Sequence, residues 1–351
     1  MKYPHIVSAD ALAACMDQGM SVLDVRSPSE FLLDHVPGAE NFPVLDDAQR
    51  VTVGTLYKQQ GPFEAKKIGA ALVAANVAQH LQQSWQGHGR DWRPLVYCWR
   101  GGNRSGACAH ILAKIGWPVH LLEGGYKAYR QYVAASLPGL AQGLELRIVC
   151  GMTGVGKSRL LQALAQAGAQ VLDLEELACH RGSLLGHLPE QAQPSQKAFE
   201  SALWEKMRRF DVTRVVYVEA ESQKVGNLRV PESLIQRMRQ APCLFLQAAL
   251  PLRVELLLQD YAHFTTAPDG LLQKLAFLTP LHGRATVQQW EQMVRLGQFA
   301  QVTQALLEQH YDPSYLRSMQ RNFSLFHNAH SWELRDLQDF PRLAQEIIAA
   351  A

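Results

Sequence analysis

Short apolar runs alternate with helical patterns along the first part of the chain. Residues 21–26, 94–97 and 119–121 are predicted strands, because each is a brief apolar run next to polar or turn-forming residues. The helix after the first strand is predicted to begin at Ser27, a suitable N-cap, with Glu30 three residues later. Strands that alternate with helices indicate a small parallel sheet wrapped by helices.

The second part of the chain repeats this alternation and then changes. Apolar strands are predicted at 144–150 and 171–173, each followed by a helical pattern. Beyond about residue 268 the pattern is helical to the end, with Trp290 and Leu296 among its apolar positions. The fold class predicted for both parts is α/β.

The length of the chain and a Pro-Gly interruption near its middle predict two domains. The 351 residues are many for one hydrophobic core. Residues 138–140, Pro-Gly-Leu, are the clearest interruption between the two patterns. We therefore predict domains at 1–138 and 139–351, the second with a helical C-terminal region over about 268–351.

Composition describes an ordinary soluble protein. Hydrophobic residues make up 47% of the chain and charged residues 19%, and the net charge of +2 directs any nucleic-acid partner to local patches. The six cysteines are scattered without a C-x-x-C pair, which argues against disulfides or a zinc site and favours a reducing compartment. With no secretory core and no run of eighteen apolar residues, we expect a cytoplasmic protein without a membrane contact.

The candidate nucleophile is Cys98, between the strand at 94–97 and a helix predicted to start at Ser105. Successive backbone N–H groups, the helix dipole and the charges of Arg100 and Arg104 all favour the thiolate form. The same N–H groups suit an oxyanion, either a phosphate or the outer atoms of a persulfide-like adduct. We predict a catalytic loop of Cys98, Arg100 and Arg104; the alternative is a buried structural cysteine.

The segments around this loop resemble rhodanese-like domains. Residues 24–26 (Asp-Val-Arg), 30–31 and 35–43 are similar to the opening signature of that family, and 122–126 to its closing signature. The resemblance covers roughly residues 5–135 and implies a small parallel sheet with the nucleophile in the bracketed loop.

One departure leaves the chemistry open. The loop is Cys98-x5-Arg104, one residue longer than the usual sulfurtransferase loop, and this spacing also resembles the rhodanese-fold phosphatases. An arginine at that distance suits a tetrahedral anion. Chalcogen transfer and phosphate ester cleavage therefore both remain interpretations of the loop.

Lysines and aromatic residues are interleaved over 54–69. Lys66 and Lys67, with Tyr57 and Phe63, are candidates for binding single-stranded RNA by charge and stacking. A solvated loop leading into a helix is the alternative interpretation of the same composition.

Residues 151–158 read G-x-x-x-x-G-K-S between a predicted strand and a helix predicted over 159–166. Glycines allow backbone N–H groups to surround a phosphate, while the lysine reaches a second phosphate and the serine can hold Mg²⁺. The predicted phosphate- or diphosphate-binding residues are Gly151, Gly154, Gly156, Lys157 and Ser158.

Further polar residues follow strands of this second domain. The strand predicted at 214–222 contains Glu219 and Glu221 near its end, where a nucleotide hydrolase would place an aspartate; metal binding and strand capping are both open for them. A site that holds a diphosphate without nucleotide turnover is a credible interpretation. The other candidate substrate-binding residues, at a strand end and on a glycine-containing loop, are Asp173, His180, Arg181 and Ser183.

The whole chain resembles the tRNA 2-selenouridine synthase family. The resemblance rests on residues 61–67, 98–105, 151–158, 174–183 and 310–315. It implies that a 2-thiouridine at the wobble position, in the anticodon arm of tRNA, is first geranylated on sulfur with geranyl diphosphate. Selenium from selenophosphate then replaces the geranylthio group.

The resemblance also implies roles for the two loops. Cys98 would carry selenium, as a selenopersulfide, with Arg100 and Arg104 around selenophosphate or the adduct. The loop at 151–158 would neutralise the diphosphate leaving group, with Mg²⁺ as an optional cofactor. The alternatives are a C-x5-R phosphatase or sulfurtransferase with a regulatory nucleotide-binding P-loop domain, and a non-catalytic module gated by nucleotide.

Overall fold

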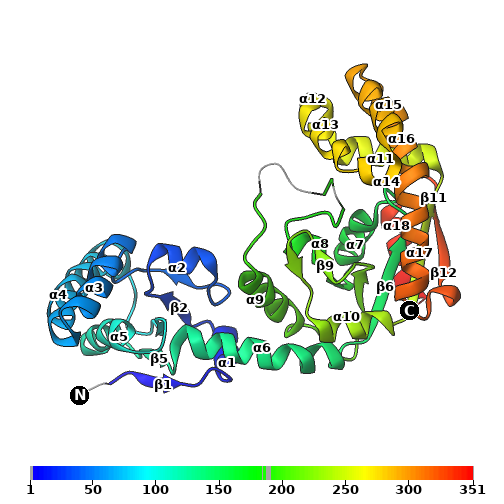
Figure 1. Ribbon diagram of the computed structural model, residues 1–351. Coiled ribbons are helices and arrows are strands. Elements are labelled where there is room, and N and C mark those ends of the chain that lie inside the picture. Colours follow the sequence, from blue (N-terminus) through cyan, green and yellow to red (C-terminus); the bar gives the residue numbers. More distant parts are fainter. Residues whose placement is uncertain (1–2, 184, 187–190, 351) are drawn as a thin grey trace. The chain divides into compact units, whose positions relative to one another are not determined.

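The computed structural model describes residues 3–183, 185–186 and 191–350 (Figure 1). The chain divides into two compact units. The first unit contains residues 1–136 and 195–205, and the second contains 137–194 and 206–351. In the part of the chain that the structure describes, no helix is long and apolar enough to cross a membrane.

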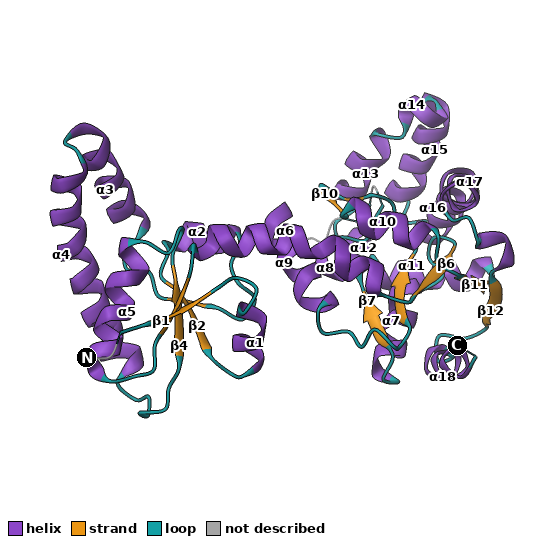
Figure 2. Cartoon of the chain, turned by 90° about the horizontal axis from the view of Figure 1, so that it is seen from below, coloured by secondary structure: helices purple, strands orange, loops and turns teal. Residues whose placement is uncertain are grey.

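The first unit is built on a five-stranded parallel sheet, in the order β1-β5-β4-β2-β3. Helices lie on both sides of this sheet (Figure 2). Its strands are β1 (His5–Val7), β2 (Ser21–Asp24), β3 (Glu40–Asn41), β4 (Pro94–Tyr97) and β5 (His120–Leu122). Its helical segments are α1 (Leu12–Asp17), α2 (Pro28–Leu33), α3 (Asp47–Gln59), α4 (Pro62–His80), η1 (Leu81–Trp85), α5 (Asn103–Ile115) and most of α6 (Gly125–Gly143) and α9 (Gln196–Met207).

Local sequence explains the central strands and their turns. All four residues of β4 are buried, as expected for the middle strand of a sheet covered on both faces. At the end of β2, Asp24 and Arg26 form a buried ion pair of 2.6 Å, which fixes the turn that leads into α2. The Ser27 backbone N–H donates to the Glu30 carboxylate, so the predicted start of α2 is confirmed.

Residues 195–205 belong to the first unit, although in the sequence they come after the first strands of the second unit. The Arg130 guanidinium of α6 pairs with Glu200 at 2.5 Å and donates to the Ser201 hydroxyl at 2.9 Å. The buried ring of Trp204 lies edge-on to Tyr129, with 5.8 Å between ring centroids. This part of α9 is therefore held by a helix of the first unit.

The second unit also has a five-stranded parallel sheet, in the order β12-β11-β6-β8-β7. Its strands are β6 (Leu146–Gly151), β7 (Gln170–Leu172), β8 (Val216–Glu219), β11 (Cys243–Ala248) and β12 (His330–Leu334), with a separate antiparallel pair β9 (Lys224–Val225) and β10 (Leu228–Arg229). The helices nearest in sequence to these strands are α7 (Lys157–Gln166), α8 (Leu174–Leu177), α10 (Glu232–Arg239), α11 (Leu250–Asp260) and α18 (Phe340–Ala349).

A second group of helices in this unit has its own hydrophobic core. Phe264, Leu275, Trp290 and Val302 belong to this cluster, which is separate from the cluster that packs on the sheet. The segments that follow α11 are α12 (Ala262–Thr266), α13 (Asp269–Ala276), α14 (Thr279–His282), α15 (Arg284–Arg295), α16 (Phe299–Leu306), η2 (Leu307–Tyr311), α17 (Asp312–Asn322) and η3 (Phe326–Asn328).

The α/β fold class is confirmed, but several local predictions are wrong. Pro138 lies inside α6, because the helix buries Leu137 and Ala141 on either side of it, although the two compact units divide only two residues earlier, between 136 and 137. The C-terminal region is not helical throughout, since β12 pairs with β11 as an edge strand. Leu296 ends α15 and is 64% exposed, so it is not part of the buried face that contains Trp290.

In the lysine-rich segment at 54–69 the expected helix start is present at Pro62, but the stretch before it is mostly the end of α3 and not a solvated loop. The segment covers the end of α3, a turn at Gly61 and the beginning of α4. Gly61 has a φ of 92°, which is the left-handed conformation that favours glycine at such a turn.

Candidate active site

The Cys98 thiol lies directly after β4, the middle strand of the first sheet. Its side chain is buried, and the Ser105 hydroxyl donates a hydrogen bond to its sulfur at 3.1 Å. Ser105 is in the first turn of α5, so the sulfur has a hydroxyl donor that belongs to the N-terminus of this helix. A thiolate would be stabilised by both the hydroxyl and the helix N-terminus. Ser105 was expected only as the start of the helix, not as a partner of the sulfur.

The loop that follows Cys98 rests on residues 122–126, the segment resembling the closing signature of rhodanese-like domains. The Tyr126 N–H donates to the Cys98 carbonyl at 2.8 Å, and the Lys127 N–H donates to the Trp99 carbonyl at 3.0 Å. Gly125 has a φ of 57°, and a Cβ there would lie 2.3 Å from the Cys98 carbonyl oxygen. A side chain at this position would therefore displace the nucleophile loop.

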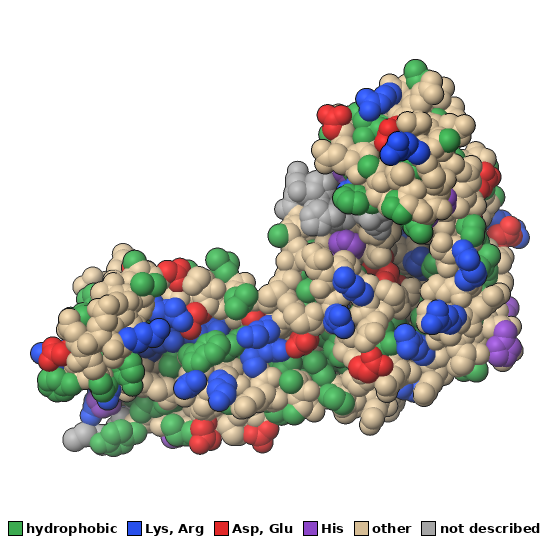
Figure 3. Space-filling model, in the orientation of Figure 1, with side chains coloured by type: hydrophobic (Ala, Val, Ile, Leu, Met, Phe, Trp, Pro, Cys, Tyr) green, Lys and Arg blue, Asp and Glu red, His purple; other side chains and the backbone are tan. Residues whose placement is uncertain are grey.

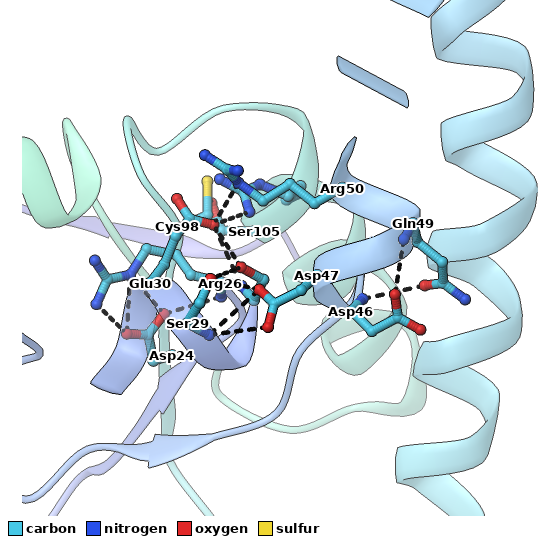
Figure 4. Close-up of polar contacts among 12 residues, drawn as sticks. Asp24, Arg26, Ser29, Glu30, Asp46, Asp47, Gln49, Arg50, Cys98 and Ser105 are labelled. Carbon is cyan, nitrogen blue, oxygen red and sulfur yellow. Dashed lines mark hydrogen bonds and ion pairs between the residues drawn. The ribbon is translucent and has the colours of Figure 1, made fainter. Parts of the chain in front are cut away.

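Arg104 is held at the edge of the loop by Glu30 of α2, with 2.8 Å between nitrogen and oxygen. Arg50 of α3 pairs with the same carboxylate at 3.0 Å. Burial would raise the pKa of Glu30, but the two guanidinium groups outweigh it and the pKa is lowered. Figure 4 shows Cys98 and Ser105 beside this cluster of charges. Glu30 thus holds the guanidinium groups of Arg50 and Arg104 near the Cys98 thiol.

A cavity of about 1090 Å³ lies between the Cys98 loop and helices α3 and α4. Its apolar wall includes Val53, Tyr57, Val73 and Trp99. On the face shown in Figure 3, Lys and Arg side chains of the first unit gather around a hydrophobic area. The basic residues that line the cavity are Arg50, Lys58, Lys66, Arg100 and Arg104.

The cavity contains most, but not all, of the residues predicted for this unit. Cys98, Arg100, Arg104 and Lys66 line it together. Lys67 does not line it and instead pairs with Glu64 at 2.8 Å on the surface of α4. A cationic wall, a stacking surface and a thiol suit an anionic substrate with an aromatic ring.

The second site surrounds the loop between β6 and α7. Gly156 caps α7 with a φ of 85°, and a Cβ there would lie 2.5 Å from the Phe340 ring. The Lys157 ammonium donates to the Gly151 carbonyl at 2.9 Å and lies 5.1 Å from the centre of the Tyr315 ring. The Gly151 N–H donates to the Tyr315 hydroxyl at 2.9 Å. The loop therefore has the strand–turn–helix setting that its sequence predicts.

A buried arginine joins this loop to the 310–315 segment. The Arg253 guanidinium donates to the Thr153 carbonyl at 2.9 and 2.8 Å and pairs with Asp312 at 2.5 Å. Together with Tyr315, Asp312 makes this C-terminal segment a support for the phosphate loop. Sequence reasoning singled out the segment but did not find these contacts, which join residues far apart in the chain.

Four carboxyl groups lie near the phosphate loop: those of Asp173, Glu175, Glu219 and Glu221. The Ser158 hydroxyl donates to Glu175 at 3.1 Å, and the Glu175 N–H donates to Glu219 at 2.8 Å. Burial, together with Asp173 and Glu175, holds the pKa of Glu219 well above its usual range. Burial and Glu175 raise the pKa of Glu221 to about 8, and burial raises that of Asp173 to about 6. The carboxyls of Asp173, Glu219 and Glu221 therefore retain protons at pH values where exposed carboxyls are ionised.

The pocket of this site has a volume of about 330 Å³. The predicted residues that line it are Gly154, Gly156, Lys157, Ser158, Arg181, Ser183 and Glu221. Four others do not line it: Gly151, Asp173, His180 and Glu219. Asp173 caps α8 by accepting from the Glu176 N–H, and the His180 Nδ1 accepts from the Gly182 N–H at 3.1 Å. Both therefore shape the segments that reach the pocket.

Two family profiles match the chain. The rhodanese-like domain matches residues 8–132, and the AAA domain of tRNA 2-selenouridine synthase matches residues 144–269. Among solved structures, a rhodanese-related protein from Thermoplasma volcanium is 21% identical and covers 36% of this chain and 92% of its own, with a TM-score of 0.25. The family assignment rests on the sequence relatives.

Relatives with the same name match over most of their length. The tRNA 2-selenouridine synthase of Nitrosomonas europaea is 35% identical over 284 residues, which are 80% of this chain and 72% of the relative. That of Hahella chejuensis is 33% identical over 332 residues, 86% of each chain. With both domains matched in order, this chain belongs to the tRNA 2-selenouridine synthase family.

Proposed function

We propose that this protein converts 2-thiouridine at the wobble position of tRNA to 2-selenouridine in two stages. Geranyl diphosphate alkylates the sulfur, and selenium from selenophosphate then replaces the geranylthio group. The observation that supports this best is that one chain has two strand–loop–helix sites whose side chains differ in chemistry. One has a thiol among arginines and the other has a P-loop backed by carboxyl groups.

The first stage belongs to the P-loop. The thiouridine sulfur attacks C1 of geranyl diphosphate, the C–O bond breaks with its electron pair on the diphosphate, and the uridine N3 loses a proton. Lys157 and the N–H groups at the start of α7 stabilise the charge that develops on the leaving group. This role needs no nucleotide hydrolysis, which agrees with glutamates in place of an aspartate at the end of β8.

Mg²⁺ is a compatible partner for the diphosphate. Among the described residues no group of three or more His, Cys, Asp or Glu side chains is arranged to hold a metal ion by itself. Mg²⁺ is commonly bound by one or two carboxylates together with substrate phosphates. Ser158 and Glu175, which are hydrogen-bonded at 3.1 Å, are the groups that would hold it and so assist neutralisation of the diphosphate.

The second stage belongs to the Cys98 loop. The Cys98 thiolate attacks phosphorus in selenophosphate, and the P–Se bond breaks with its electron pair on selenium. Arg100, Arg104 and the loop N–H groups hold the phosphoryl oxygens. The hydrogen selenide ion then attacks C2 of the uridine and expels geranylthiolate. Water hydrolyses the Cys98 thiophosphate, and the proton released protonates the geranylthiolate.

This route differs from the selenopersulfide implied by the family resemblance. Selenium in selenophosphate is already at the selenide level, so a Cys98 selenopersulfide would need an additional oxidant. Attack at phosphorus needs none, and it also accounts for the C-x5-R spacing that resembles phosphatases. The phosphoryl group is the part of the donor that such a loop is shaped to hold.

Nucleoside mass spectrometry of tRNA tests the proposed function. Purified protein is incubated with 2-thiouridine-containing tRNA and geranyl diphosphate, with or without selenophosphate. The expected products are S-geranyl-2-thiouridine without selenophosphate and 2-selenouridine with it. Unchanged 2-thiouridine under all conditions would refute the proposal. Cys98-dependent turnover of an aryl phosphate would then favour the phosphatase alternative.

The assignment of geranyl diphosphate to the P-loop has its own test. Equilibrium binding of labelled geranyl diphosphate is compared between the wild type and Lys157→Ala. We expect the variant to bind at least about tenfold more weakly, because a charge-assisted contact to the diphosphate is lost. Unchanged affinity would place the diphosphate elsewhere. If the P-loop binds ATP or GTP but not geranyl diphosphate, the nucleotide-gated alternative is favoured.

A further inference from the structure

The phosphate pocket of the second unit continues into a narrow apolar slot. The two spaces share Thr153, Ser183, Leu257, Tyr261 and Tyr311 as lining residues, so one begins where the other ends. The polar space contains Lys157 and Ser158, whereas the slot does not. A single ligand can therefore have its charged end at the P-loop and another part in the slot.

The walls of the slot come from the separate helical core of this unit. Helices α11, α12, α13 and α16, which Figure 1 labels, and segment η2 all contribute residues to it. The apolar side chains that define it are Leu257, Phe264, Leu271, Phe299, Val302 and Leu306. Four of these, Phe264, Leu271, Val302 and Leu306, belong to the core cluster of the helical group. The slot thus enters the interior of that group of helices.

Polar groups are concentrated where the two spaces meet. The Ser183 side chain lies close to both Tyr261 and Tyr311, and burial raises the pKa of each tyrosine. The Arg181 guanidinium lies 4.9 Å from the centre of the Tyr261 ring and donates to the Asp260 carbonyl. This junction places hydroxyl groups and a cation at the phosphate end of the slot, and the apolar side chains lie beyond it.

The character of the slot decides between ligand classes. A purine or pyrimidine base would bring several ring nitrogens and carbonyls into it, and buried polar groups without partners are costly. A hydrocarbon chain has no such requirement and gains from burial. The slot has a volume of about 70 Å³, roughly half that of an apolar cavity that holds a benzene ring (about 150 Å³), so it has room for about three carbons. That is room for the distal part of a short branched chain whose first carbons lie at the junction.

We infer that the slot binds the hydrocarbon tail of the diphosphate held by the P-loop and selects its length. The inference rests on the proposed function, in which a prenyl diphosphate is the ligand of the P-loop. It adds a specificity site, formed by apolar residues of α12, α13 and α16 that do not line the phosphate pocket. It also explains why a phosphate loop is combined with a helical core that the sheet does not need for its own packing.

Binding of ligands that share a head group tests this inference. Geranyl diphosphate, the five-carbon dimethylallyl diphosphate and inorganic pyrophosphate are titrated into the full chain. The wild type is expected to bind geranyl diphosphate at least about tenfold more tightly than pyrophosphate, because the tail buries apolar surface. Val302→Phe fills the slot, so it is expected to remove this preference and leave pyrophosphate binding unchanged.

A matched variant separates filling of the slot from general overpacking. Val287→Phe adds the same volume to the same helical core, but Val287 is not among the slot residues. It should retain the preference for geranyl diphosphate. Phe299→Ala, which enlarges the slot, should raise the relative affinity for the fifteen-carbon farnesyl diphosphate. Thermal unfolding of each variant confirms that it is folded.

The outcomes distinguish the inference from the proposed function. Equal affinities of the wild type for geranyl diphosphate and pyrophosphate would overturn the slot, while the P-loop would remain a diphosphate site. If Val302→Phe and Val287→Phe lose the preference for geranyl diphosphate to the same extent, the slot is also overturned. If none of the three ligands binds, the assignment of the P-loop to a prenyl diphosphate fails, and the slot fails with it.

Discussion

The two units place their proposed anion sites at the same point of similar sheets. Each sheet has five parallel strands, and each loop follows the middle strand, β4 in the first unit and β6 in the second. In both cases a helix N-terminus follows the loop, so backbone N–H groups are available to an anion. The architecture alone therefore predicts anion binding in both units and does not distinguish their chemistry.

The side chains behind the two loops differ in charge. In the first unit, Glu30 pairs with Arg50 and Arg104 and so fixes cations beside the thiol. In the second, Lys157 is backed by buried carboxyl groups whose pKa values are raised. The arginines of the first unit suit a thiolate nucleophile. The carboxyl groups of the second unit suit a diphosphate leaving group that binds together with Mg²⁺. The reaction at each site is therefore determined by the charged side chains next to the loop and not by the loop architecture itself.

The largest expected effect is the loss of selenium incorporation in Cys98→Ser. On tRNA that is already S-geranylated, we expect the rate to fall by at least about a thousandfold, because a serine hydroxyl is a far weaker nucleophile than a thiolate. The rate is measured by nucleoside mass spectrometry. Cys108→Ala is the control, since burial raises the pKa of that thiol to about 12. A Cys98→Ser protein that retains the activity would remove the first site from the reaction.

Loss of Arg253 should have the largest effect on stability. Arg253→Met leaves Asp312 and the Thr153 carbonyl without their partner, and breaking a buried pair costs about 3–5 kcal/mol. Urea unfolding of the full chain measures this change. Arg159→Met is the matched control, because its ion pair with Asp260 is about one-third exposed and is expected to contribute less than about 1 kcal/mol. Similar losses in both variants would contradict the role given to Arg253.

The buried carboxyl groups of the second unit are expected to make its stability depend on pH. Glu221 has a pKa of about 8 in the folded protein against an ordinary value of 4.5, so the folded state binds this proton more tightly. Its contribution to stability is therefore lost as pH rises from about 4.5 to about 8, with a slope of up to about 1.4 kcal/mol per pH unit.

Glu221→Gln should remove that part of the pH dependence. The free energy of unfolding is measured by denaturant titration at several pH values between 5 and 8 for the wild type and the variant. Glu255→Gln, which changes an exposed carboxylate on α11, should keep the wild-type slope. If the slopes of the wild type and Glu221→Gln coincide, the buried proton on Glu221 is refuted.

The smallest effect concerns the basic wall of the first cavity. Lys66→Ala is expected to weaken tRNA binding by about two- to fivefold and to lower the salt slope by about 1, as for one phosphate contact. Lys67→Ala should have less effect, because Lys67 already pairs with Glu64 and does not line the cavity. Filter binding over a range of salt concentrations compares them. A larger loss with Lys67→Ala would reverse the assignment of the RNA-binding wall.

Local motifs made the two loops predictable. The strand, turn and helix that surround Cys98 and residues 151–158 are adjacent in sequence, so their patterns carry the geometry. The start of α2 was predictable for the same reason, since Ser27 and Glu30 are three residues apart. The sequence also indicated two chemically different halves, because only the second contains a P-loop.

Contacts between distant segments were not predictable in this way. Tyr315 reaches Gly151 across 164 positions, and Arg253 reaches Asp312 across 59. No local pattern encodes such pairs. Strand β12 was missed because only Leu334 of its five residues is buried, which gives an edge strand little apolar signal. The helix over Pro138 was missed because burial of its neighbours outweighed the usual effect of proline.

The central claim is that the two sites serve separate stages, and one measurement tests it most directly. Lys157→Ala and Cys98→Ser are each given 2-thiouridine tRNA with geranyl diphosphate, and S-geranylated tRNA with selenophosphate. The account predicts opposite defects: Lys157→Ala fails to geranylate but still incorporates selenium, and Cys98→Ser geranylates but incorporates none. Loss of both activities in either folded variant would contradict the separation of the stages.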